Sequence, residues 1–139
     1  MVWKGAWNTM AIILQKVNVN PKGRKTCDCV VRAIASAENK NWKDVLIDLT
    51  EYSLKYGYMV NDKKNFQKYL KDLGYEKLPM PKDENGKKVK LKSFKYDSDK
   101  IYLVGIKQHL TCVKKGVLID DWDCSEKYIL NIWCKKIWN

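Results

Sequence analysis

Histidine is almost absent from this chain of 139 residues, in which His109 is the single one. Any mechanism that needs an imidazole must therefore use that ring. Long apolar runs are also missing: Met10–Leu14 is far shorter than the roughly 20 residues that a membrane-spanning helix needs. No small-residue cleavage site follows this run, which argues against a secretory signal. We therefore expect no membrane span and a cytoplasmic location.

The cysteines are odd in number, which argues against a framework of disulfides. They are Cys27, Cys29, Cys112, Cys124 and Cys134. In a chain without an export signal, thiols stay reduced, and cysteine chemistry then usually means catalysis or metal binding.

Aromatic residues are plentiful, with 6 Trp and 8 Tyr in a chain that is 45% hydrophobic. Disordered chains lack aromatic residues at this density. The length is that of one ordinary domain, so we expect a single domain over residues 1–139. Met10 is an alternative start, which would make Met1–Thr9 a dispensable leader.

Apolar residues at helical spacing predict a first helix that begins at about Asp28 or Cys29. Asp28 is a candidate N-cap, because its carboxylate can accept the free amide protons of the first turn. Two further amphipathic helices follow. One runs from Trp42 to a stop at Gly57, and the other starts after Asn61 or Asp62 and ends at Gly74.

Met10–Val19, near the start of the chain, is predicted as an edge strand or extended entry segment. The C-terminal part of the chain also has the pattern of β-strands. The strands predicted in it are Ile101–Ile106, His109–Val113, Val117–Ile119 and Tyr128–Trp133, with a tight turn at Lys114–Gly116. Helices followed by strands predict an α+β domain in which N-terminal helices pack on a C-terminal antiparallel sheet.

Cys29 stands where a loop runs into a helix, and the helix dipole and first-turn amides there favour a thiolate. His109 begins a strand, from which its ring can reach the edge of a cleft and take the proton of Cys29. Asp120 lies 11 residues later, so the hairpin returns it roughly opposite His109. Asp121 and Asp123 compete for this orienting role, because a register slip of one residue exchanges the faces of a strand.

These residues resemble those of the papain-like cysteine peptidases. Asp28–Ala35 is similar to the nucleophile helix of small peptidase-like proteins that phages and mobile elements often encode. The segments His109–Val113 and Val117–Asp123 are similar to the strand–turn–strand unit that supplies their His and Asp. The resemblance implies a papain-like fold and a cysteine peptidase or amidohydrolase. Cys29 would be the nucleophile, His109 the general base and acid, and Asp120 the residue that orients the imidazole.

The resemblance also implies a substrate that is a peptide or protein, with a peptide, isopeptide or cell-wall amide bond to cleave. If a phage encodes the chain, its location would be the cytoplasm of the host cell. The superfamily commonly places a Gln before the nucleophile as an oxyanion donor, and here Gly23, Arg24 and Lys25 fill that stretch. The backbone amide of Cys29, together with Asn20 or Asn18, would have to replace the missing donor.

Two other classes of function fit parts of the sequence. The net charge of +11, with a Lys-rich surface, is typical of proteins that bind an anionic partner such as nucleic acid or cell wall. The chain would then be a binding protein on a catalytically inactive papain-like scaffold. A structural zinc site is the other alternative, with Cys27, Cys29, His109 and Cys112 as ligands, although the C-x-C spacing is tighter than zinc sites usually show. For the peptidase we expect neither a cofactor nor a metal.

Overall fold

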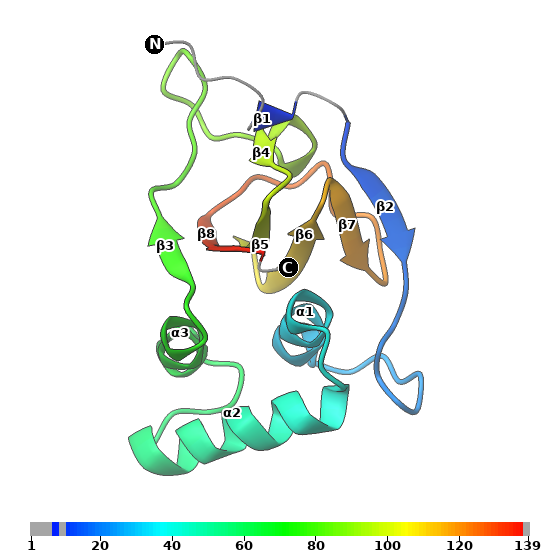
Figure 1. The fold of residues 1–139 in the computed structure, drawn as a ribbon, viewed down its shortest axis with the longest axis vertical. Helices are drawn as coiled ribbons and strands as arrows, with labels where there is room; N and C mark the ends of the chain where they lie inside the picture. Colours follow the sequence, from blue (N-terminus) through cyan, green and yellow to red (C-terminus); the bar gives the residue numbers. More distant parts are fainter. Residues whose placement is uncertain (1–6, 9–10, 138–139) are drawn as a thin grey trace.

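The computed structural model describes residues 7–8 and 11–137, which form an α+β architecture of helices on a mixed sheet (Figure 1). The described residues form three α-helices, α1 (Cys29–Glu38), α2 (Trp42–Tyr56) and α3 (Lys63–Asp72), and one short 3-10 helix, η1 (Leu91–Ser93). The six strands of the main sheet, in its spatial order, are β2 (Ile13–Lys16), β7 (Val117–Asp120), β6 (His109–Lys114), β5 (Lys100–Ile106), β8 (Asn131–Lys136) and β3 (Glu76–Leu78).

The helices begin and end at the residues that local chemistry favours. Asn41 caps α2 by accepting the Asp44 N–H at 2.8 Å, and Gly57 ends that helix with φ of 80°, a conformation open to glycine. Asp62 caps α3 by accepting the Lys64 N–H at 2.8 Å. The helix stops at Asp72, two residues before Gly74, the predicted end.

The sheet is not wholly antiparallel as predicted, because β2 pairs with β7 in parallel. Both strands run toward the start of α1, and the Val17 N–H donates to the Asp120 carbonyl at 2.8 Å just beyond their ends. β2 leads into the loop that precedes α1, so it must run in the direction of β7 to deliver the chain there. The other described pairings in this sheet are antiparallel.

The last strand also begins later than predicted, at Asn131 instead of Tyr128. Ile129 is fully buried against the far side of the sheet, and its N–H donates to the Val89 carbonyl at 2.9 Å. This segment therefore pairs with the long loop that follows β3 before β8 joins β5.

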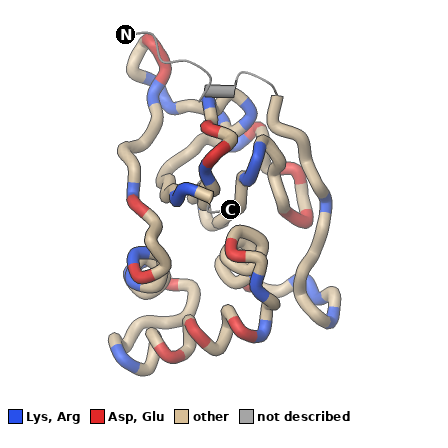
Figure 2. Tube along the Cα trace, viewed as in Figure 1, with Lys and Arg blue, Asp and Glu red and all other residues tan. Residues whose placement is uncertain are grey.

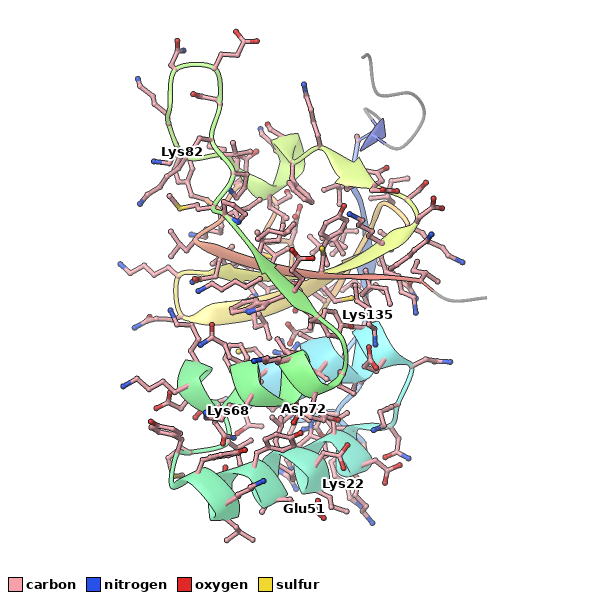
Figure 3. The ribbon with its side chains drawn as sticks, turned by 60° about the vertical axis from the view of Figure 1, so that its left-hand side comes forward. Lys22, Glu51, Lys68, Asp72, Lys82 and Lys135 are labelled. Atoms are coloured by element: carbon pink, nitrogen blue, oxygen red, sulfur yellow. The ribbon has the colours of Figure 1, made fainter. Side chains whose placement is uncertain are left out.

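Two apolar layers cover the two faces of the sheet. The helices lie together on one face, as the edge-on view of Figure 3 shows, and α1 is the helix nearest to β6 and β7 (Figure 1). On the other face, the long loop segments bury Leu91, Tyr96 and Ile129 against the strands. Lys135 extends from β8 toward the helices and binds Glu38 Oε2 at 2.6 Å and the Leu73 carbonyl at 3.1 Å (Figure 3).

The hairpin of β6 and β7 closes with the tight turn that the sequence predicts. Lys114 pairs with Val117, and the two turn residues, Lys115 and Gly116, have φ of 53° and 74°. Two residues of positive φ give the turn a twist that matches the twist of the strands. Tyr96 packs directly beneath Gly116.

The predicted leader falls partly on residues outside those described, namely 1–6 and 9, and so does the alternative start Met10. Within it, β1 (Trp7–Asn8) pairs antiparallel with β4 (Tyr96–Asp97) in a separate two-stranded sheet.

Prediction for the hairpin: Gly116→Ala lowers the free energy of unfolding by about 2 kcal/mol or more. The new methyl group would sit at positive φ and approach Tyr96 Cζ within 2.8 Å. Gly86→Ala is the matched control, since Gly86 has φ of 75° and no atom within 4 Å of an added β-carbon. Urea unfolding of the two variants measures the difference. Equal losses of stability would contradict the tight packing of Tyr96 under the turn.

Candidate active site

His109 and Asp120 meet across the β6–β7 hairpin, with His109 Nε2 2.6 Å from Asp120 Oδ2. In the register of the hairpin, Cys112 pairs with Ile119, so Asp120 follows on the same face of the sheet as Thr111 and His109. The contact is therefore a diagonal one between neighbouring strands. The side chains are only 9% and 2% exposed, respectively. Because a carboxylate only accepts hydrogen bonds, Nε2 carries a proton and Nδ1 is the nitrogen left for another partner.

Asp120 is held as a carboxylate by several donors. Its Oδ1 accepts from Arg32 Nη1 at 3.2 Å and from the Asp121 N–H at 2.7 Å. Burial alone would raise the pKa of Asp120, but its hydrogen bond and ion pair with His109 outweigh burial and lower the pKa to about 2. The orienting group is thus negative throughout the neutral pH range.

Arg32 is the buried cation that sequence reasoning missed. Its Nε binds Oδ1 of Asp28, the residue just before α1, at 2.9 Å. Its Nη1 binds Asp120 and Asp121, both at 3.2 Å. The sequence shows Arg32 only as a charged residue within an apolar helix. Because α1 is buried on nearly all sides, a charge at this position needs acidic partners, and this is a signal that the sequence does contain.

Asp28 does not act as the predicted N-cap, because its side chain makes no hydrogen bond to the first turn of α1. Its carboxylate instead accepts from Asn20 Nδ2 at 3.0 Å, Arg32 Nε at 2.9 Å and Trp42 Nε1 at 2.9 Å. These stronger buried donors draw the carboxylate away from the helix end. Within the described residues, no side chain caps the amides at the head of α1, and these amides remain free to stabilise an anion.

Cys29 is the first residue of α1 and is partly exposed. Burial alone would raise the pKa of Cys29, but hydrogen bonding to the His109 ring and the Leu110 N–H lowers it. The positive charges of His109 and Arg32 act in the same direction, so the pKa lies below its usual value. The structure therefore brings Cys29, His109 and Asp120 together, as the sequence predicts.

His109 is held as an imidazolium by the anions around it. Burial would lower the pKa of His109, but hydrogen bonds with Asp120, Cys124 and Cys29 raise it to about 11. The thiol of Cys124, which is fully buried, lies with its Sγ 3.9 Å from Asp120 Oδ2. The ring of Trp122 stands edge-on to the imidazole, with 5.1 Å between the ring centroids. Neither Cys124 nor Trp122 was expected at the site.

The two alternative acids have other partners. Asp121 Oδ1 binds Arg32, and Asp123 is exposed and accepts the Ser125 N–H at 3.0 Å. Of the three acids, Asp120 is the one that contacts the imidazole.

A cavity lined by Cys29 and His109 opens beside the thiol. The two predicted oxyanion donors, Asn18 and Asn20, lie in the loop before α1 and do not line this cavity. Asn20 is buried and donates from Nδ2 to Asp28, and Asn18 donates from Nδ2 to the Arg24 carbonyl at 3.0 Å. Asn20 Oδ1 also accepts from the Lys22 N–H at 2.9 Å, so its amide stabilises the loop. The carboxamides that do line the cavity are those of Asn61, Gln108 and Asn131.

The zinc ligands of the alternative hypothesis do not gather at one place. Cys27 is exposed in the loop, while Cys112 is buried in the core between α1 and the sheet. Among the described residues, the donor atoms within 4.8 Å of one another are those of His109, Asp120 and Cys124. The positively charged guanidinium of Arg32 binds Asp120 at 3.2 Å, and His109 and Asp120 already bind each other at 2.6 Å. These three side chains therefore fit an ion pair better than a metal centre.

None of the helices in the described residues has the length and apolar character needed to cross a bilayer. Comparison of the chain with family models, curated proteins and solved structures found no match. The interpretation of the site therefore depends on its own geometry.

Prediction for pH dependence: the His109–Asp120 pair stabilises the fold most between about pH 4 and pH 6.5. The pKa of His109 is 6.5 in the unfolded chain and about 11 in the folded one. The stability that this rise contributes is fully present below pH 6.5 and is lost as the pH rises toward 11. The lowered pKa of Asp120 adds stability that is present above 3.8 and is lost as the pH falls toward 2.

Urea unfolding of Cys29→Ala and Cys29→Ala/His109→Gln at pH 5 and pH 9 measures this effect without interference from the thiol. The stability difference between these proteins shrinks from pH 5 to pH 9, by up to about 1.4 kcal/mol per pH unit above 6.5. The same difference at both pH values would show that the pair carries no charge.

Proposed function

We propose that the chain is a papain-like cysteine peptidase or amidohydrolase that cleaves a peptide, isopeptide or cell-wall amide bond. The observation that carries this proposal is the buried 2.6 Å contact between His109 Nε2 and Asp120 Oδ2. The same imidazole lines one cavity with Cys29 and lowers the pKa of that thiol. The order of the parts supports it as well: a cysteine heads a buried helix, and a histidine and an acid follow on two strands of one hairpin.

In the first step, the thiolate of Cys29 attacks the carbonyl carbon of the substrate amide. The lowered pKa of Cys29 favours the thiolate, and the raised pKa of His109 keeps the proton on the imidazole. The oxyanion that forms lies near the uncapped amides at the head of α1, among which the Cys29 N–H is the first donor.

The C–N bond then breaks, and the imidazolium of His109 gives its proton to the leaving amine. Formation of the thioester consumes the thiolate, one of the anions that raise the pKa of His109. The pKa of the imidazolium therefore falls at the step in which it must give its proton to the leaving amine. The neutral ring next takes a proton from water, which attacks the thioester and releases the acid product with the thiol.

Binding of nucleic acid or another anionic partner has less support. Figure 2 shows basic and acidic residues interspersed along the helices and loops, instead of basic residues gathered on one element. Several of the lysines are also paired, as Lys90 and Lys92 are with Glu126.

Prediction for the nucleophile: iodoacetamide at pH 6 alkylates Cys29 at least about tenfold faster than Cys27, and His109→Ala removes this advantage. Cys27 is an internal control because it is more exposed than Cys29. Accessibility alone would thus favour Cys27. Mass spectrometry of peptides from a time course gives both rates. Faster labelling of Cys27, or no effect of His109→Ala, would count against the proposal.

Prediction for the acid: Asp120→Asn lowers the rate of Cys29 alkylation at pH 6 by about tenfold or more, whereas Asp123→Asn leaves it unchanged. Asparagine no longer favours the imidazolium, so the proton of Cys29 loses its acceptor. Asp123 is the matched control because it lies three residues away and contacts Ser125. Circular dichroism verifies that both variants are folded. Equal rates in the two variants would remove Asp120 from the mechanism.

A further inference from the structure

A cavity of about 340 Å³ opens directly beside Cys29. It lies between the head of α1, the start of α3 and the adjoining ends of β5 and β6, and both Cys29 and His109 line it. A volume in this range is typical of ligand-binding pockets. A group bound in this cavity would therefore adjoin the reacting thiol.

The floor of the cavity is apolar. Phe66 and Trp133 meet edge to face, with 5.5 Å between their ring centroids, and both are nearly fully buried. A side chain at Gly105 would compete for this space, because its β-carbon would lie 3.3 Å from Asn131 Cβ and 3.6 Å from the Trp133 ring. The glycine thus leaves room for the wall that Asn131 and Trp133 form.

No carboxylate lines the cavity within the part of the chain that the structure describes, and the negative charge at its edge is the proposed thiolate of Cys29 itself. Lys63 lines it together with His109. The nearest acid in sequence, Asp62, directs its carboxylate to the Lys64 N–H at 2.8 Å. The carboxamides of Asn61, Gln108 and Asn131 can donate or accept, so they accommodate a peptide backbone without selecting a charge.

We propose that this cavity selects peptide substrates that present a carboxylate close to the scissile bond. This inference rests on the proposed peptidase function. The carboxylate would pair with Lys63, while the aliphatic part of the residue lies on Phe66 and Trp133. A basic residue at the same place would be repelled by Lys63. The carboxylate belongs either to an acidic side chain or to the free C-terminus of the peptide.

Two matched peptide vinyl sulfones, with Glu or Gln next to the electrophile, test the side-chain source. The thiolate of Cys29 adds to the vinyl carbon that is bonded to the peptide, and the vinyl carbon beside the sulfone takes the proton of His109, so nothing leaves. At low salt we expect the Glu reagent to react roughly two- to fivefold faster, the range for one exposed charge pair. The ratio falls toward one at 0.5 M salt because the charges are screened.

Competition tests the terminal source. Two competitor peptides are compared: tri-alanine with a free C-terminal carboxylate, and tri-alanine with a C-terminal amide. The measurement is how strongly each peptide slows the reaction of Cys29 with the Gln reagent. Stronger protection by the free acid, with equal rates for the Glu and Gln reagents, assigns the carboxylate to the peptide terminus.

We expect Lys63→Gln to remove the preference for a carboxylate, whether it is seen with the Glu reagent or with the free-acid peptide. Lys64→Gln should retain this preference. Lys64 is the matched control because it is the next residue on the same helix and its Nζ lies over the Tyr58 ring, 5.8 Å from the centroid. If Cys29 reacts but shows no preference for a carboxylate, or if the preference survives in Lys63→Gln, this inference is overturned. The peptidase proposal is not overturned by either result. A Cys29 that reacts with no reagent overturns the peptidase proposal and this inference together.

Discussion

The buried hydrogen bond between His109 and Asp120 is the interaction on which the site depends. Two charged groups in the protein interior are stable only when each has enough partners. Asp120 obtains them from Arg32 and from the Asp121 N–H, while His109 faces Cys29 and Cys124 on its other sides. Arg32 joins α1, which begins at the proposed nucleophile Cys29, to Asp120, the carboxylate that contacts the imidazole. The position of Cys29 relative to His109 is therefore fixed by the same charges that stabilise the imidazolium.

The topology explains why these groups meet at one place. β2 and β7 run in parallel toward the head of α1, so the loop before Cys29 and the end of β7 arrive there together. The hairpin of β6 and β7 then brings His109 and Asp120 to the same end of the sheet. The start of α3 closes the opposite side, which leaves the cavity lined by Lys63 and Phe66 next to the thiol. The thiol of Cys29, the imidazole and the proposed binding site thus share one edge of the sheet.

The sequence predicted the α+β class, a first helix that begins at about Asp28 or Cys29 and the turn at Lys114–Gly116, because local periodicity and turn chemistry determine these features. It left three acids open as partners of His109, since only the register of the hairpin distinguishes them. The parallel pairing of β2 and the hydrogen-bond partners of Asp28, Asn18 and Asn20 were predicted wrongly or not at all. They depend on contacts between distant segments, such as Asp28 with Trp42 and Arg32 with Asp120, which no short pattern encodes.

The charge state of the imidazole is the central claim, and His109 can be observed directly because the chain has no other histidine. An NMR titration of the ring carbon and proton signals between pH 5 and pH 9 measures it without assignment. The account predicts signals of a doubly protonated ring that remain nearly constant to pH 9, because the pKa of His109 is raised to about 11. A titration with a midpoint near pH 6.5, the usual value for histidine, would contradict the buried ion pair and the mechanism built on it.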